Sequence, residues 1–426
     1  NYKNSGVEWL GEIPEHWEVK KMKFIGNIYA GINGKKGDDF SKEYSDGIKS
    51  FIPFTNICNN IKIDDNQYQY VKISENENQN RVKKNDILFL MSSETLDDIA
   101  KNSIYLGENT ELYLNSFCKG FRISKHNVNA EFVNYLFLST TYRNYFSLVG
   151  RGFTRINLKQ EFINDAYALL PKLKEQTAIA NFLDNKTTKI DQAIAIKQQQ
   201  IALLQERRQI LIHKAVTRGL NENVKLKDSG VEWIGEIPEH WEVKALKYCT
   251  NIFRGKFTHR PRNDERLYDG NYPFFQTGDV ARAGKFLLEY RQTLNEFGLR
   301  VSTLFPKGTI VMTIAANIGD IAILDIDACF PDSIVGFEPM NYLERGFLYN
   351  SLLVMKVQFM SSTIKNTQMN LNVDRIGTNA IVIPSIEEQK QIVEFIETAT
   401  TKIATAISLK EQEIEKLKEY KMSLID

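Results

Sequence analysis

The chain has 426 residues, a length that suits two to four domains rather than one. Its hydrophobic fraction of 42% and charged fraction of 25% are those of an ordinary globular protein, and no apolar run approaches the length of a membrane span. The formal net charge of +1 counts against binding nucleic acid through overall charge alone, although local basic clusters remain compatible with it.

The cysteines and the amino-terminal residues indicate a cytoplasmic protein. The amino-terminal residues NYKNSGVEW lack the basic and apolar regions of a secretory signal. The cysteines occur singly, with no C-x-x-C spacing and no histidine at ligand spacing, so we expect buried thiols in a reducing compartment and no metal site. They are Cys58, Cys118, Cys249 and Cys329.

The chain carries a tandem duplication. Residues 5–20 read SGVEWLGEIPEHWEVK, and residues 229–244 differ from them only in having Ile234 in place of Leu10. All four tryptophans lie in these two copies. A looser repeat relates residues 170–212 to residues 383–425. Fixed ends around a divergent middle indicate one scaffold that carries two different readers.

Each half begins with a block in which short strand-like runs are broken by Gly, Asn and Asp. The mixture of strands with a few helices predicts an α/β or α+β unit built on a twisted sheet. The first half predicts strands at 49–56, 86–91, 117–123 and 166–170 and a helix at 130–148. The second predicts strands at 272–276, 309–313, 321–324, 333–337 and 380–383 and a helix near 343–360.

A long helix is predicted after each block, because Pro171 and Pro384 are followed by Glu-Gln in the first turn and by residues that favour a helix. The first helix runs to Arg218, with Gly219 as a plausible stop. Some forty residues give a rod of about 60 Å. We therefore expect block 1 at residues 1–170, helix 1 at 171–218, block 2 at 219–383 and helix 2 at 384–426.

Both helices carry a heptad stripe that matches position for position, including a threonine and two basic interruptions. An apolar stripe needs a partner, and the other helix is the simplest one; the alternative is that each helix packs on the sheet of its own half. The apolar stripe positions are Leu183, Ile190, Ile194, Ile201, Leu204 and Leu211 in the first helix, and Ile396, Ile403, Ile407, Ile414, Leu417 and Leu424 in the second.

The sequence contains no recognisable catalytic constellation. There is no phosphate-binding G-x-x-x-x-G-K-[ST], no dinucleotide fingerprint, no G-x-S-x-G elbow and no H-E-x-x-H. The [ND]-P-P-aromatic motif of amino-methyltransferases is also missing. His16 and His240 match in the two copies, which favours a scaffold or partner-contact role over catalysis.

Two segments of each half are candidates for reading DNA, with a solvated or structural loop as the alternative for any single residue. Arginine can bond guanine, lysine can neutralise phosphate, and Asn or Gln can read adenine. The candidates in the polar loops near 31–60 and 255–280 are Lys35, Lys36, Arg254, Lys256, His259, Arg260 and Arg262. Those in the segments before each long helix are Arg151, Thr154, Arg155, Lys365, Asn366 and Gln368.

The repeated SGVEW[LI]GEIPEHWEV opening, the variable block and the P-x-x-x-E-Q helix start together resemble the specificity subunit of a type I restriction–modification system. The resemblance covers essentially the whole chain. It implies that each variable block is a target recognition domain reading one half of a split DNA site. It also implies that the two helices pair antiparallel and set the gap between the half-sites, in a pseudo-twofold arrangement that suits duplex DNA.

The same resemblance implies partners and no catalysis by this chain. We expect double-stranded DNA, two modification subunits that methylate adenine at N6, and ATP-dependent restriction subunits; a membrane partner is not expected. S-adenosylmethionine, ATP and Mg are expected on the partner subunits. Two alternatives stay open: a fused methyltransferase or nuclease with unrecognised motifs, and a coiled-coil scaffold that never meets nucleic acid.

Overall fold

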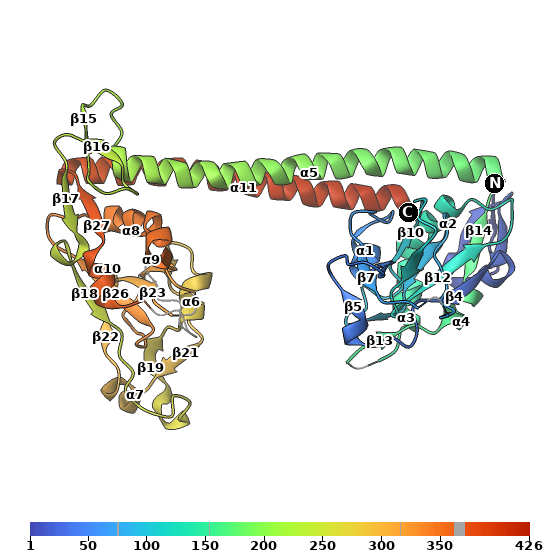
Figure 1. Ribbon diagram of the computed structural model, residues 1–426, viewed down its shortest axis with the longest axis horizontal. Coiled ribbons are helices and arrows are strands. Elements are labelled where there is room, and N and C mark those ends of the chain that lie inside the picture. The colour runs from blue at the N-terminus through green and yellow to red at the C-terminus, as the bar shows by residue number, and fades with distance from the viewer. Residues whose placement is uncertain (75, 153, 316, 362–370) are drawn as a thin grey trace. The chain divides into compact units, whose positions relative to one another are not determined.

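The computed structural model describes residues 1–426 except 75, 153, 316 and 362–370. The chain divides into two compact units, of which the first holds residues 1–197 and 411–426 and the second holds residues 198–410. Each unit thus contains one variable block and a stretch of each long helix (Figure 1). The expected boundaries at 170, 218 and 383 follow the ends of strands and helices, whereas the compact units divide both helices.

The first unit is built on two four-stranded sheets, in the orders β10-β8-β12-β4 and β11-β6-β7-β5, with three short strand pairs, β1-β2, β14-β3 and β13-β9. Its strands are β1 (Tyr2–Asn4), β2 (Glu12–Pro14), β3 (Glu18–Lys21), β4 (Gly26–Ala30), β5 (Phe40–Ser41), β6 (Lys49–Ile52), β7 (Gln69–Val71), β8 (Ile87–Leu90), β9 (Ser92–Ser93), β10 (Asn102–Ile104), β11 (Leu112–Leu114), β12 (Cys118–Ile123), β13 (Ile156–Asn157) and β14 (Tyr167–Leu170). Its short helices are α1 (Phe54–Asn59), α2 (Ala130–Leu138), α3 (Thr140–Val149) and α4 (Gln160–Asp165).

Strand β8 shows why its sequence is apolar without alternation. Ile87 and Phe89 enter the core beneath α2 and α3, whereas Leu88 and Leu90 enter a second core that includes residues of β6 and β11. A strand that is covered on both faces needs apolar side chains at successive positions. The sheet of β8 is therefore the middle layer of the block, between two helices and the second sheet.

The second unit repeats this plan with a five-stranded sheet, β18-β26-β23-β24-β20, a four-stranded sheet, β21-β19-β25-β22, and the pairs β15-β16 and β17-β27. Its strands are β15 (Leu226–Asp228), β16 (Glu236–Pro238), β17 (Glu242–Ala245), β18 (Thr250–Arg254), β19 (Tyr268–Phe274), β20 (Phe286–Leu287), β21 (Gln292–Leu294), β22 (Leu304–Phe305), β23 (Ile310–Thr313), β24 (Ile321–Leu324), β25 (Ala328–Cys329), β26 (Ile334–Pro339) and β27 (Ala380–Ile383). Its short helices are α6 (Thr277–Arg282), α7 (Glu296–Arg300), α8 (Arg345–Val354), α9 (Lys356–Ser361) and α10 (Val373–Thr378).

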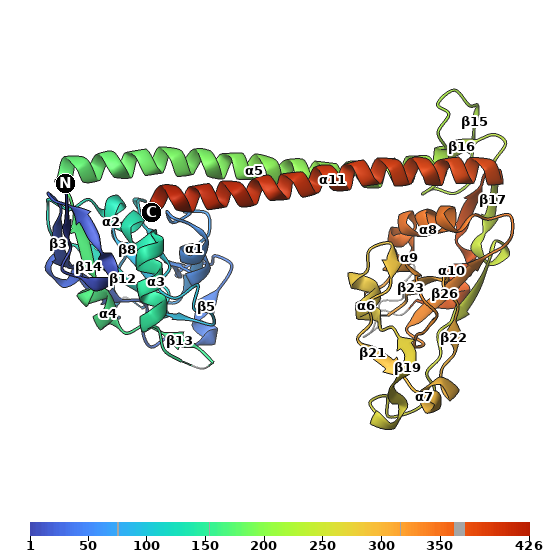
Figure 2. The ribbon, with the colours of Figure 1, turned by 180° about the vertical axis from the view of Figure 1, so that it is seen from behind.

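Both long helices form. Helix α5 spans Leu173–Arg218 and α11 spans Ile386–Ile425. Gly219 follows α5 with a φ of 74°, the left-handed conformation that ends helices. Within each unit a stretch of α5 lies alongside a stretch of α11 (Figure 2). In the first unit Lys197 bonds Glu413 and Asp191 bonds Lys421, so the paired residues ascend along α5 while they descend along α11, and the helices are antiparallel.

Three predicted elements differ from the structure. The helix expected over 130–148 is two helices, because Ser139 takes an extended conformation between α2 and α3. The helix expected near 343–360 is likewise divided into α8 and α9, with Met355 between them. The strand expected over 49–56 ends at Ile52, since Pro53 starts the helix α1. Apolar periodicity does not report such breaks.

Candidate functional site

In the first unit the amino-terminal repeat is bound to the start of α5. Nε2 of His16 lies 2.9 Å from Oε2 of Glu175, and Nε1 of Trp17 donates to Oε1 of the same carboxylate across 3.1 Å. The strand pair β14-β3 brings the two segments together, because it ends where α5 begins. The duplicated histidine and tryptophan therefore hold a scaffold joint, which agrees with the scaffold role expected for His16.

The second unit has the same joint. Nε2 of His240 lies 2.9 Å from Oε1 of Glu388, and Nε1 of Trp241 donates to that oxygen across 3.3 Å. Ser385 adds hydrogen bonds from its backbone N–H and its hydroxyl. Burial raises the pKa of the Glu388 carboxyl, but the hydrogen bonds from His240, Ser385 and Trp241 outweigh it, and the pKa lies below its ordinary value.

The glutamine after each glutamate is buried and joins three backbone groups. Nε2 of Gln176 donates to the carbonyls of Pro171 and Asn127, and its Oε1 accepts from the backbone N–H of Asn129. Gln389 makes the same three bonds in the second unit, to Pro384, Tyr342 and Glu344. The Glu-Gln pair thus binds both the opening repeat and the loop before α2 or α8. The sequence showed that these motifs were matched, but it did not show that they touch.

Asp332 binds the arginines of the polar loop near residues 255–280 and Arg254 just before it. We call this segment the basic loop of the second unit. Arg254, the last residue of β18, donates from Nε to the Asp332 carbonyl. Nη2 of Arg262 lies 2.5 Å from Oδ1 of Asp332, and Nη2 of Arg260 lies 3.8 Å from Oδ2. The Asp332 carboxylate therefore lies near two guanidinium groups while its backbone carbonyl holds a third, and the cluster keeps an excess of positive charge. Because these arginine side chains are already held in place, they lose less conformational entropy when they bind an anion. This favours contact with phosphate or guanine.

A glycine sets the path of this loop. A Cβ added at Gly255 would lie 2.2 Å from the carbonyl oxygen of Pro331, so no larger residue fits after Arg254. The backbone N–H groups of Gly255 and Lys256 bond the carbonyls of Ile334 and Phe330. These contacts bring the loop against the residues around Asp332. Sequence reasoning missed Asp332, which no repeat or periodicity marks.

The remaining basic-loop candidates have separate environments. Lys256 is exposed. His259 is half-buried, with Nε2 lying 2.9 Å from Oδ2 of Asp264. The hydrogen bond from the Arg266 guanidinium, aided by His259, holds the pKa of Asp264 well below its usual range against a smaller opposing effect of burial. His259 is thus turned toward a carboxylate of its own loop.

In the first unit the expected loop residues differ from one another. The ammonium of Lys35 is largely covered and bonds Glu77 across 2.6 Å. That hydrogen bond, followed by one from the Ser74 backbone, lowers the pKa of Glu77 to about 2. Lys36 is exposed. Lys35 is therefore committed to an internal ion pair, and of this pair Lys36 is the better placed for contact with phosphate.

The segment before α4 places its two arginines differently. Arg155 is exposed, with its guanidinium 5.0 Å from the ring centre of Phe117. Arg151 is exposed and donates to the carbonyl of Gly150 across 2.8 Å. Thr154 is also exposed. The corresponding candidates of the second unit, Lys365, Asn366 and Gln368, lie outside the described residues.

The stripe residues of the long helices lie on their covered faces. Every predicted apolar stripe position is buried or half-buried, whereas Ile196, Leu203, Ile210 and Leu409, which lie off the stripe, are more than half exposed. The basic interruptions of the stripe at Lys197 and Lys421 form ion pairs with Glu413 and Asp191 of the other helix. The heptad pattern thus marks the covered faces of both helices, which near the joints also pack on the blocks, since Ile396 belongs to the core of the second unit.

The described part of the chain offers no alternative centre of metal chemistry. It contains no group of three or more His, Cys, Asp or Glu residues arranged to hold a metal ion. Burial raises the pKa of the Cys118 thiol, and all four cysteines are unbridged. None of the described helices combines the length and hydropathy that crossing a bilayer requires.

Comparison with known proteins gives one consistent match. The family described as type I restriction modification DNA specificity domain matches residues 14–206 and again residues 238–419. The chain is 26% identical to the type I restriction enzyme MjaVIII specificity subunit of Methanocaldococcus jannaschii, over 97% of this chain and 92% of that one. It is 23% identical to the EcoKI specificity subunit of Escherichia coli K12, over 91% and 82%.

Solved structures share the fold. A chain from a study of complex assembly and conformational transition of the type I R-M system aligns with a TM-score of 0.74 at 14% identity, covering 97% of each chain. The HsdS subunit of Thermoanaerobacter tengcongensis aligns with a TM-score of 0.53 at 14% identity, covering 97% of this chain and 96% of that one.

Proposed function

Since the chain belongs to the type I restriction–modification DNA specificity family and recognises DNA sequence through two domains, we propose that each unit reads one half of a split DNA site. The observation that carries this proposal is the duplication itself. The two units share the Glu-Gln joint and the sheet plan, but their exposed polar loops differ in sequence and in structure. Two scaffolds of the same plan that carry loops of different sequence suit two half-sites of different sequence.

Within the second unit, we assign the reading surface to the cluster around Asp332. Arg260 and Arg262 are about half exposed and share the carboxylate of Asp332. This one negative charge orients both guanidinium groups but balances the positive charge of only one of them. Lys256 is exposed in the same loop and suits a phosphate contact. In the first unit the exposed Lys36, Arg151, Thr154 and Arg155 are the corresponding candidates.

We further propose that the paired helices fix the gap between the half-sites. The support is the matched apolar stripe and the antiparallel ion pairs of α5 and α11. A helical spacer converts its length into a number of base pairs, because its rise per residue is constant.

The chain belongs to a system with modification and restriction partners, and we propose that two modification subunits bind it, one for each copy of the duplicated scaffold. Adenine N6 methylation with S-adenosylmethionine, and ATP- and Mg-dependent restriction, would then take place on the partner subunits in the cytoplasm. This division of labour accords with the family, whose domain is one of DNA specificity.

The decisive experiment is genome-wide mapping of N6-methyladenine in cells that carry this chain with its modification subunit. The comparison is with cells that lack only this chain. A split motif that vanishes with the chain supports the proposal and gives both half-sites and the gap. An unchanged methylation pattern in an active modification system would overturn it.

A further inference from the structure

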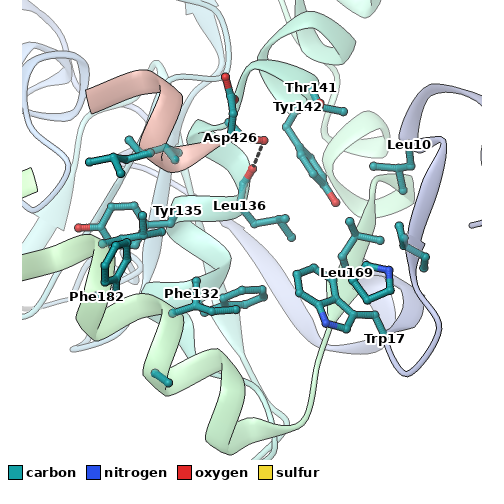
Figure 3. Close-up of a pocket in the computed structure, with 18 of the residues that line it drawn as sticks. Leu10, Trp17, Phe132, Tyr135, Leu136, Thr141, Tyr142, Leu169, Phe182 and Asp426 are labelled. Atoms are coloured by element: carbon teal, nitrogen blue, oxygen red, sulfur yellow. Dashed lines mark hydrogen bonds between the residues drawn. The ribbon is translucent and has the colours of Figure 1, made fainter. Parts of the chain in front are cut away.

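In the first unit a lysine of the variable block binds the long helix α5. Lys62, which lies against the edge strand β10, forms an ion pair with Asp184 on α5, and its Nζ lies 3.3 Å from Oε2 of Glu131 on α2. Helix α2 also contacts α5 here, because the hydroxyl of Tyr135 lies 3.1 Å from Oγ1 of Thr187, and Figure 3 shows Tyr135 next to α5. Lys62 therefore connects the edge of the sheet to both helices.

The second unit has an ion pair of the same kind. The ammonium of Lys285 binds the carboxylate of Glu397 on α11 and lies 5.8 Å from the ring centre of Tyr349 on α8, close enough for a cation–π attraction. Helix α8 holds the place of α2, because the backbone N–H groups of Glu344 and Asn129, just before the two helices, both bond the buried glutamine of their joint. We call the two ion pairs, one in each unit, the lysine bridges.

The carboxylates of the two lysine bridges correspond in the duplication. Asp184 and Glu397 are both the ninth residue after the glutamate of their joint, and each directly follows a buried residue of the apolar stripe. At a rise of 1.5 Å per residue, the joint and the bridge hold each helix at two points about 14 Å apart. Two attachment points on one rod can fix the tilt of a block, which a single point cannot.

The lysines, in contrast, do not correspond. Strands β10 and β24 hold the same place in their sheets, beside β8 and β23. The backbone N–H of Ile104 in β10 bonds the carbonyl of Ile61, whereas that of Ile323 in β24 bonds the carbonyl of Lys285. The structural counterpart of Lys285 is thus Ile61, one residue before Lys62. The bridges are therefore not simple copies, and lysines at different positions of two divergent blocks reach the same position of the scaffold helix.

The lysine bridges suit orientation better than stability. Their side chains are partly exposed, and ion pairs of this kind add little to the free energy of folding. Apolar packing supplies the stability of the contact between block and helix, as for Ile392 and Ile396 of α11 in the core of the second unit. Hydrophobic attraction has no preferred direction, whereas a charged hydrogen bond holds two groups in a defined geometry.

We propose that the lysine bridges fix the angle of each block on its long helix and thereby restrict the chain to one gap length. The proposal rests on the proposed function, in which each block reads a half-site and the helices set the gap. Without its bridge a block can tilt on its joint and reach a half-site displaced by one base pair, about 3.4 Å. Lys62, Asp184, Lys285 and Glu397 are then positioning residues, which determine specificity for the gap without touching DNA.

The test measures methyl transfer by the complete modification complex on three duplexes that carry both half-sites. One has the native gap, and the others have a gap one base pair shorter or longer. Lys285→Glu and Glu397→Lys each place like charges at the bridge, and we expect the preference for the native gap to fall about tenfold or more in each. The double variant restores opposite charges and should return the preference to within about threefold of the original.

Two further variants serve as matched controls. Glu394→Lys makes the same charge change at an exposed position one turn earlier on α11 and should leave the preference for the native gap unchanged. Lys285→Gln removes the ion pair without repulsion, so it carries the test if the charge-reversed variants do not fold. The midpoint of thermal unfolding should fall by less than about 4 °C in Lys285→Gln, since the bridge adds little stability.

The inference is overturned if the folded single variants keep the original preference, or if the double variant does not restore it. It is also overturned if a single variant slows methylation equally on all three duplexes, because the bridge would then contribute to stability alone. In each of these cases the original chain still prefers its native gap, so the proposed function stands. If the original chain methylates all three duplexes equally, the gap-setting role of the helices fails, and this inference fails with it.

Discussion

Trp241 donates its indole N–H to the carboxylate of Glu388, and Trp17 makes the same bond to Glu175 in the other unit. The most similar segments of the chain, the tryptophan-rich opening and the Glu-Gln helix start, are thus the two sides of one joint. Their preservation through the duplication reflects the need to fix a long helix on its recognition domain. Variation is then free to accumulate in the loops between the joints.

The joint of the second unit is expected to tolerate loss of its carboxylate poorly. Glu388→Ala leaves the buried indole N–H of Trp241 without its acceptor, which costs about 1–3 kcal/mol of unfolding free energy. Glu175→Ala should cost less, about 0.5–1.5 kcal/mol, because Trp17 is only half-buried and water can replace the acceptor. Urea unfolding measures both, with the exposed Glu394→Ala as control. Equal losses of unfolding free energy in all three variants would contradict the role of Glu388 and Glu175 in the joint.

The same carboxylate predicts a pH dependence. The pKa of Glu388 is lower in the folded chain than its ordinary value of 4.5. The unfolded chain therefore binds this proton more readily, and the stabilisation is present above pH 4.5 and lost as the pH falls through the lower folded value. Glu388→Gln should be less stable than the original at pH 7, and the difference should shrink steadily below pH 4.5. A difference that grows on acidification would refute this.

Gln389 should be among the most sensitive polar positions. Its buried amide bonds the carbonyls of Pro384 and Tyr342 and the N–H of Glu344. Gln389→Met keeps the volume but leaves these groups unpaired, so we expect a loss of roughly 2–4 kcal/mol of unfolding free energy. Gln389→Glu retains one acceptor but loses both donors and should also destabilise. Thermal unfolding of both variants, with the exposed Gln391→Met as control, is the measurement.

The elements were predictable from sequence where one interaction dominates. The heptad stripe is a repeated pattern of burial, and so it predicted the covered faces of both long helices. Strands β24 and β27 occur at the predicted residues because uninterrupted β-branched and apolar runs have few alternatives. The break at Ser139 was missed because one extended residue leaves the apolar spacing of a helix almost unchanged.

The candidate sites were less predictable for a physical reason. Composition shows that Lys35 and Lys36 are both basic, but only the fold shows that Lys35 is paired with Glu77. Likewise the arginines of the basic loop were visible in sequence, whereas Asp332, about 70 residues further along, was not. Long-range pairing between charges carries no periodic signal in a single sequence.

The Asp332 cluster gives a prediction specific to one half-site. Arg262→Ala removes a guanidinium held by Asp332, and we expect recognition by the second unit to fall about 10- to 100-fold, the usual value of a base or phosphate contact. Asp332→Asn should impair the same half-site, because Arg260 and Arg262 lose their common anchor. Methylome mapping with the complete modification complex measures this, and the exposed Lys418→Ala serves as control. Equal loss at both half-sites would reject the assignment.

The helical spacer gives a prediction about length alone. Lys197 lies beside Glu413, so residues near Gln200 of α5 oppose residues near Lys410 of α11. Insertion of one heptad after Gln200 and one after Lys410 keeps the apolar stripe in phase and lengthens each helix by about 10 Å. The gap of the methylated motif should therefore grow by about three base pairs while both half-sites stay the same.

Insertion of three residues at each place shifts the stripe out of phase, and it should abolish methylation instead of changing the gap. If the two heptad insertions leave the gap unchanged, or alter the half-sites, the helices do not set the distance between the half-sites.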